Sequence, residues 1–230
     1  MACLAESERH KSGLIEVRAP SQIESANYAS RMGLGEHIAD HCGAENTFPI
    51  TRRNKTRSLS ELRRYQTEDD ADDLVIEVDE CLRNAGLRPG ERQPVLEILE
   101  EVAQNSIEHS GTSVGYFAAQ TYGHANHDLR VAFAVGDFGI GIRESFSGTD
   151  YESNDDLEAI LSASQLGVSR HGDPNRGKGL PFSIGHKGVA GSGRFTVRSG
   201  RATVSFSSAN ATPRERNWLP GTLITALVDC

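Results

Sequence analysis

One helical stretch, residues 96–109 with the sequence LEILEEVAQNSIEH, constrains the fold of this chain most. At 100° per residue, its apolar side and the residue before it form one stripe that can face a core. The members of this stripe are Val95, Leu99, Val102 and Ser106. Glu101, Asn105 and His109 form a second, polar stripe bordering the first. A carboxylate and an amide there suggest that something occupies the adjoining space, although a solvated helix shoulder is the alternative.

Length and charge limit the classes of protein to which the chain can belong. Its 230 residues suffice for one domain with an extension or for two small domains. A net charge of −8 argues against a non-specific grip on a nucleic-acid backbone, which needs a basic surface. The 4 cysteines show neither CxxC nor zinc spacing, which favours a reduced compartment. No apolar run approaches the roughly 18 residues of a membrane span, so we expect a cytoplasmic protein without membrane or nucleic-acid partners.

The first 65 residues carry short and weak patterns. Ser21 to Glu24 is a capping-box signature for a helix, and a second short helix is predicted from Leu34 to His41. Asn46 to Arg57 is interpreted as a connector, and Ser58 to Glu61 as a cap that opens another short helix. A loose surface arm and a packed subdomain or partner-binding element are both open interpretations of this region.

The elements after residue 66 are better defined. TEDD, starting at Thr67, predicts the cap of a helix that Gly86 ends, and the residue pair Asp155 and Asp156 predicts the cap of a later helix stopped by Gly167. The segments TSVGYFAAQTY and LRVAFAV predict two strands joined by a short turn and therefore antiparallel. Three further strands are predicted from RFTVRS and ATVSF, hinged at Gly200, and from TLITALV after a Pro-Gly pair.

A carboxylate followed by glycines at positions +2 and +4 ends the second predicted strand, at Asp137, Gly139 and Gly141. The glycines let the backbone approach a ligand closely, while the carboxylate remains as one fixed acceptor. Such an acceptor beside an apolar wall can bind the exocyclic amine of adenine, whereas guanine presents a carbonyl. A turn in which Asp137 caps its own backbone is the alternative.

A second glycine-rich stretch, residues 175–180 with the sequence NRGKGL, precedes a predicted helix. Free N–H groups at a helix start attract anions, and Arg176 and Lys178 add positive charge, so this stretch predicts a phosphate-binding loop. It lacks the spacing of a Walker loop, and a flexible surface loop is the alternative. Residues 143–176 are too long for an ordinary connection and suit a lid that becomes ordered on nucleotide.

Taken in order, EVAQNSIEH, DFGIGI, the long lid, RGKGL and GTLITALV closely resemble the GHKL ATP-binding superfamily of gyrase, heat-shock chaperone, histidine kinase and mismatch-repair ATPases. The resemblance runs from about Thr67 to the C-terminus, and its layout is most similar to the anti-sigma-factor serine kinases. It implies a Bergerat-type two-layer α/β sandwich with a mixed, mostly antiparallel sheet and helices on one face. We therefore expect an N-terminal extension at residues 1–65 and an ATP-binding domain at residues 66–230.

The resemblance also implies a role for each motif residue. Asn105 would ligate Mg²⁺ together with phosphate oxygens and water, and Asp137 would accept from the adenine amine. Thr222 or Thr225 would add an indirect contact on the adenine side, and His109 would either contact phosphate or pack as a hydrogen-bonded histidine. The other nucleotide-binding residues would be those of the two glycine boxes, Gly139, Gly141, Ile142, Arg176, Gly177, Lys178, Gly179 and Leu180.

Glu101 separates two hypotheses about function. Four residues before Asn105, it can take a proton from an attacking water or hydroxyl, although a partly exposed helix acid is the alternative. The first hypothesis is an enzyme of bacterial regulation or signalling that hydrolyses Mg-ATP or transfers its phosphoryl group to Ser or Thr of a partner protein. The second is a nucleotide-gated protein-binding module without significant turnover. A regulatory partner protein is expected in both, and a homodimer is left open.

Overall fold

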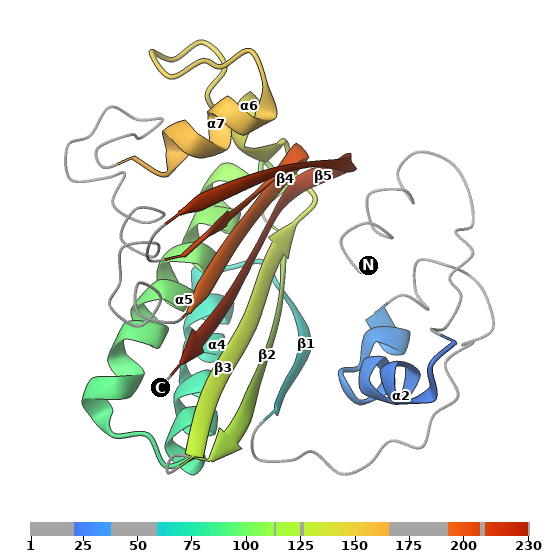
Figure 1. Cartoon of the computed structure of the whole chain (residues 1–230), viewed down its shortest axis with the longest axis vertical. Coiled ribbons are helices and arrows are strands. Elements are labelled where there is room, and N and C mark those ends of the chain that lie inside the picture. Colours follow the sequence, from blue (N-terminus) through green and yellow to red (C-terminus); the bar gives the residue numbers. More distant parts are fainter. Residues whose placement is uncertain are drawn as a thin grey trace.

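The structure, a computed structural model, describes residues 21–37, 59–112, 114–124, 127–165, 193–207 and 210–229. Its strands are β1 (Leu59–Tyr65), β2 (Gly115–His124), β3 (His127–Asp137), β4 (Arg194–Phe206) and β5 (Ala211–Asp229). Its helices are α2 (Ile23–Arg31), α4 (Glu68–Asn84), α5 (Pro89–His109), α6 (Gly141–Ser145) and α7 (Asp156–Ala163). The strands form one five-stranded sheet in the order β1-β2-β3-β5-β4, and α4 and α5 cover one of its faces (Figure 1).

The architecture is an α/β fold that fits the predicted two-layer sandwich, with one difference in the sheet. Every strand pairing in the described part of the chain is antiparallel, so the expected mixed sheet is not observed there. A parallel pair of strands needs a crossover connection. Here β2 leads directly into β3, and α4 and α5 connect β1 to β2, with which β1 pairs antiparallel. Helices α4 and α5 lie together on one face of the sheet, whereas α2, from the predicted N-terminal extension, lies on the opposite side (Figure 1).

The central helix α5 packs as its apolar stripe predicts. Val95, Leu99, Val102 and Ser106 are all buried, with Leu99 fully inaccessible to solvent. The Ser106 hydroxyl also hydrogen-bonds the buried Tyr65 hydroxyl of β1, which ties the helix to the far edge of the sheet. The helix begins at Pro89, earlier than the pattern indicated, because proline fits the first helical turn, where no N–H partner is required.

Strand β1 corrects the predicted short helix opened by Ser58 to Glu61. The segment pairs antiparallel with β2 instead, with a register irregularity between Ser60 and Arg63. Ser60 donates to Glu77 of α4 at 3.2 Å, and Arg63 forms an ion pair with the same carboxylate at 2.7 Å. These contacts and the partner strand outweigh the local capping signal. The sheet therefore includes one strand, β1, from the predicted N-terminal extension (residues 1–65) together with strands from residues 66–230.

The N-terminal elements are confirmed in part. The helix after Ser21 exists as α2, but its N-cap is Gln22 with no side-chain hydrogen bond, so the predicted capping box does not form. Ile23, the first residue of α2, is 62% exposed. Residues 34–37 are helical, while the rest of the second predicted helix and the connector from Asn46 to Arg57 lie outside the described residues.

The predicted elements from Thr67 to β3 and the helix at Asp155 are confirmed. Thr67 and Asp70 form the capping box of α4, with the Asp70 N–H donating to the Thr67 hydroxyl at 3.1 Å. Strands β2 and β3 pair antiparallel from Gly115 opposite Asp137 onward. The Asp155 side chain caps α7, which ends at Ala163; the predicted stop at Gly167 lies outside the described residues.

The hinge predicted at Gly200 is confirmed and is a reversal of the chain. Gly200 has a φ of 57°, a conformation that favours glycine, and the strand register shifts there. Thr196 Oγ1 lies 3.1 Å from Ser205 Oγ, whereas a straight strand would separate them by about 30 Å. Strand β4 thus folds back on itself. Strand β5 begins at Ala211, well before the predicted TLITALV strand, and its exposed first part pairs with the second half of β4.

We expect Leu99→Ala to lower the free energy of unfolding by about 2–5 kcal/mol, because the truncation leaves a cavity in the fully buried face of α5. Ile76→Ala on α4 is the control, since Ile76 is 60% exposed and should change stability by less than about 0.5 kcal/mol. Urea unfolding followed by circular dichroism measures both variants. Equal losses in the two variants would contradict the packing of α5.

Candidate functional site

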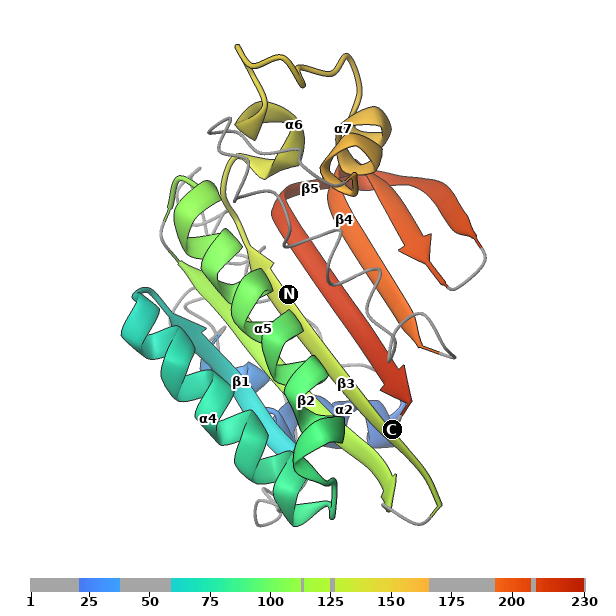
Figure 2. The same cartoon turned by 90° about the vertical axis from the view of Figure 1, so that its left-hand side faces the viewer.

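The loop after β3 packs against the C-terminal end of α5, so two of the predicted motifs meet at one end of the molecule (Figure 2). The Ile140 N–H donates to the Ser110 carbonyl oxygen at 2.9 Å. A Cβ atom on Gly139 would lie 1.8 Å from that same oxygen, so only glycine permits this approach. The end of the helix that carries Glu101 and Asn105 is thereby joined to the DFGIG segment.

Asp137, the last residue of β3, places a carboxylate in the interior of this junction. The residue is 6% exposed. Its Oδ1 atom accepts the Gly139 N–H at 2.8 Å and the Thr222 N–H of β5 at 3.2 Å. Among the described residues, no hydrogen-bond donor reaches Oδ2. The carboxylate is therefore held in a fixed orientation through one of its two oxygens.

Burial raises the pKa of Asp137 to about 6, although its two backbone hydrogen bonds act in the opposite direction. The charged form loses hydration that two N–H groups replace only in part. At neutral pH the carboxylate is thus ionised and under-solvated. A donor brought to Oδ2 would relieve this deficit.

Thr222 and Thr225, the two threonines considered for the adenine side, lie in different places. Thr222 adjoins Asp137 and contacts it through its backbone N–H at 3.2 Å rather than through its hydroxyl. Thr225 pairs with Ala134 further along β5 and lines a groove on the other face of the sheet. The structure brings only Thr222 to the Asp137 junction.

Glu101 and Asn105 contact one another on α5. Asn105 Nδ2 donates to Glu101 Oε1 at 3.5 Å, the long limit of a hydrogen bond, and both side chains are partly buried. Burial raises the pKa of Glu101; the Asn105 contact lowers it, and the neighbouring Glu108 and Glu100 charges raise it further. A carboxylate with a raised pKa is a better proton acceptor for a water or hydroxyl.

The phosphate side of the predicted site lies outside the described residues. This applies to Arg176, Gly177, Lys178, Gly179 and Leu180, and to residues 166–175 of the predicted lid, whose earlier part, residues 143–165, is described and contains α7. His109 is the last residue of α5, but its side chain is also outside the description. Of the first glycine box, Gly141 begins α6 with a φ of 77°, and Ile142 follows it and packs against the core.

Two serines at this junction were missed by sequence reasoning. Ser110 supplies the carbonyl that receives the Ile140 N–H, and Ser199 of β4 accepts the Ile142 N–H at 3.0 Å. Every residue carries a backbone carbonyl, so nothing in the sequence could single out Ser110 as the acceptor. Ser199 had a weak one, since it directly precedes the hinge at Gly200.

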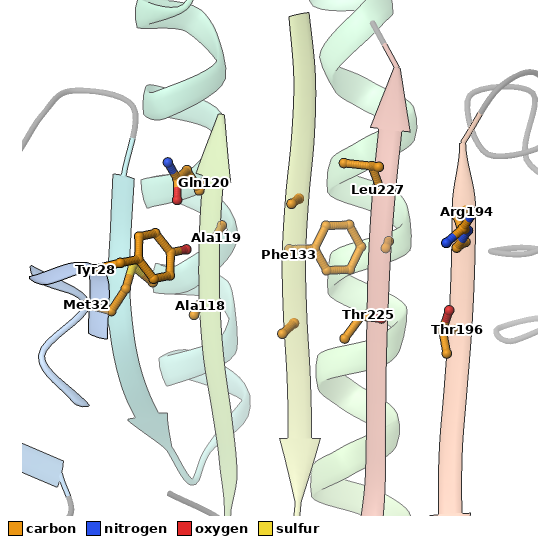
Figure 3. Close-up of a pocket in the computed structure, with 13 residues that line it drawn as sticks. Tyr28, Met32, Ala118, Ala119, Gln120, Phe133, Arg194, Thr196, Thr225 and Leu227 are labelled. Atoms are coloured by element: carbon orange, nitrogen blue, oxygen red, sulfur yellow. The ribbon is translucent and has the colours of Figure 1, made fainter. Parts of the chain in front are cut away.

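A separate groove of about 320 Å³ lies on the sheet face opposite α4 and α5 (Figure 3). Tyr28 of α2 and Met32, which directly follows α2, lie at one end, and Arg194 of β4 lies at the other. Its floor includes the small side chains of Ala118, Ala132 and Ala134. Of the predicted site residues that the structure describes, only the alternative Thr225 lines this groove.

No protein-family model matches the chain, and no curated protein or solved structure is significantly similar to it. The described residues contain no group of three or more His, Cys, Asp or Glu that could hold a metal ion. None of the described helices is long and apolar enough to cross a membrane. The functional assignment therefore depends on the geometry of the Asp137 junction.

We expect Asp137→Asn to become more stable relative to wild type as pH rises. A raised pKa means that the folded state binds the proton more tightly than the unfolded state, so wild-type stability falls between about pH 4 and pH 6. Asparagine does not titrate, and the stability difference should shift in its favour by about 2–3 kcal/mol between pH 4 and pH 7.5. Urea unfolding at both pH values measures it, and a difference independent of pH would contradict the burial of this charge.

Proposed function

We propose that this protein binds Mg-ATP through a Bergerat-type fold of the GHKL superfamily and hydrolyses it or transfers its phosphoryl group to a partner protein. The observation that carries the proposal is the Asp137 carboxylate, which is buried and fixed through one oxygen, while its other oxygen has no donor among the described residues. The packing of its loop on the end of α5 supports a site shared with Asn105 and Glu101.

Adenine is the base that suits this acceptor. Its exocyclic amine can donate to Oδ2 of Asp137, whereas the carbonyl of guanine would place a lone pair against an anionic oxygen. In a buried site the hydrogen bond is stronger than in water, and an unmet acceptor costs more. Both effects favour adenine over guanine at the same position.

The Asn105 amide suits one position in the coordination shell of Mg²⁺. Its Nδ2 points to Glu101 at 3.5 Å, so its Oδ1 atom is directed elsewhere as an oxygen ligand. Mg²⁺ accepts one or two protein oxygens together with phosphate oxygens and water, which fits a site without a carboxylate cluster among the described residues. When bound, Mg²⁺ would neutralise phosphate charge and orient the terminal phosphate.

Glu101 is the residue proposed as the general base. It lies one helical turn before Asn105 and is partly buried, and its pKa is raised. It can therefore accept the proton of a water or of a partner hydroxyl directed at the terminal phosphate. Its contact with Asn105 keeps the carboxylate on the side of α5 where the metal ligand lies.

We expect Asp137→Asn to weaken Mg-ATP binding at least tenfold, because the variant turns a charged acceptor into an amide that can present its own donor to the base. Asn105→Ala should weaken the binding of Mg-ATP and leave the binding of metal-free ATP nearly unchanged. Isothermal titration calorimetry measures both, with the exposed Asp150→Asn as a matched control. Wild-type affinity in either variant would count against the assignment.

The rate of ATP turnover distinguishes an enzyme from a nucleotide-gated binding module. We expect Glu101→Gln to lower phosphate release from ATP by about 10²–10⁴-fold, the usual contribution of a general base, with Mg-ATP affinity within threefold of wild type. Glu80→Gln, an acid on α4 whose side chain is 61% exposed, is the control. Nucleotide binding without measurable turnover in the wild-type protein, alone or with a partner, would identify a nucleotide-gated binding module instead.

A further inference from the structure

Ser199 of β4 joins the two chain segments that flank the Asp137 carboxylate. Its hydroxyl oxygen accepts the Ile142 N–H at 3.0 Å and donates its proton to the Gly221 carbonyl at 3.0 Å. A hydroxyl can donate once and accept twice, so the two bonds are compatible. The residue is 3% exposed, and water therefore does not compete for either bond.

The two partners of Ser199 lead directly to Asp137. Ile142 follows the glycine loop whose Gly139 N–H donates to Asp137 Oδ1, and Gly221 precedes Thr222, whose N–H donates to the same oxygen. The hydrogen bonds form a closed circuit from Asp137 through the loop to Ser199 and back through β5. Removing the hydroxyl would open the circuit on both sides.

Close packing around the circuit leaves little room for another arrangement. A Cβ atom on Gly221, whose φ is 72°, would lie 2.4 Å from the Asp137 backbone oxygen and 2.5 Å from Oδ1. A Cβ atom on Gly141 would lie 2.8 Å from the Ser199 hydroxyl oxygen. The chain thus approaches Asp137 as closely as glycine allows, and the Ser199 hydroxyl occupies the space between the segments.

The position of Ser199 is itself fixed by the reversal at Gly200. The Asp156 carboxylate of α7 accepts the Arg201 N–H at 2.8 Å and fills the space where a Gly200 side chain would lie. Arg143 approaches the same carboxylate at 3.8 Å. The tip of β4 is therefore anchored to the helices that follow the glycine loop.

We infer that Ser199 is a positioning residue for the recognition of adenine: its hydroxyl holds the glycine loop and β5 so that Asp137 presents Oδ2 to the base. Ser199 does not itself contact the nucleotide. The inference rests on the proposed binding of ATP. It adds that recognition of the base depends on a residue of β4 that acts through the backbone of two other segments.

The test compares Mg-ATP with Mg-tripolyphosphate, which lacks the base, by calorimetry on Ser199→Ala. We expect the dissociation constant for Mg-ATP to rise roughly tenfold, because two buried backbone groups lose their shared partner. Binding of Mg-tripolyphosphate should stay within twofold of wild type. Thr203→Val is the matched control. It also removes a hydroxyl from β4, but one that has no hydrogen-bond partner among the described residues.

The outcomes separate this inference from the proposed function. If the wild-type protein does not bind Mg-ATP, both fail. If it does, unchanged Mg-ATP affinity in Ser199→Ala, or parallel loss of Mg-ATP and Mg-tripolyphosphate binding, overturns the role of Ser199 alone. Ser199→Cys, which keeps the size of the side chain and weakens both hydrogen bonds, replaces Ser199→Ala if thermal melting shows that the alanine variant does not fold.

Discussion

The burial of one carboxylate at the end of the central strand β3 sets the arrangement of everything around it. An ionised group removed from water needs donors, and the chain supplies them from Gly139 and from Thr222. Providing both requires a tight loop after β3 and a β5 strand that approaches Asp137 at Gly221. The glycine loop and the close approach of β5 at Gly221 are consequences of this electrostatic requirement.

Helix α5 contributes both to the stability of the fold and to the geometry of the candidate site. Its apolar stripe forms the core beneath the sheet, and Leu99 is among the most deeply buried side chains. The adjacent stripe carries Glu101 and Asn105, which touch each other at the edge of that core. Because one rigid element carries both stripes, packing against the sheet also fixes the position of the polar pair. The hydrogen bond from the Ile140 N–H to the Ser110 carbonyl also fixes the position of the glycine loop relative to α5.

Local and periodic features were predictable from the sequence. The α5 stripe, the Thr67 cap and the β2–β3 pair depend on neighbouring residues, and the structure confirms them. Strand β1 was missed because its polar sequence gains its strand character from β2 and from Glu77 of α4. The Ser199 contacts were missed for the same reason, since they join segments that only the folded sheet brings together.

The Thr222 to Asp137 hydrogen bond spans 85 residues of chain. A donor this distant reaches the carboxylate only when β5 has docked along β3, so both hydrogen bonds to Oδ1 are present only in the fully assembled sheet. Detachment of β5 at Gly221 would leave the buried charge with fewer donors. A ligand that engages Asp137 would bind the docked state preferentially and, by mass action, would suppress fraying of this strand.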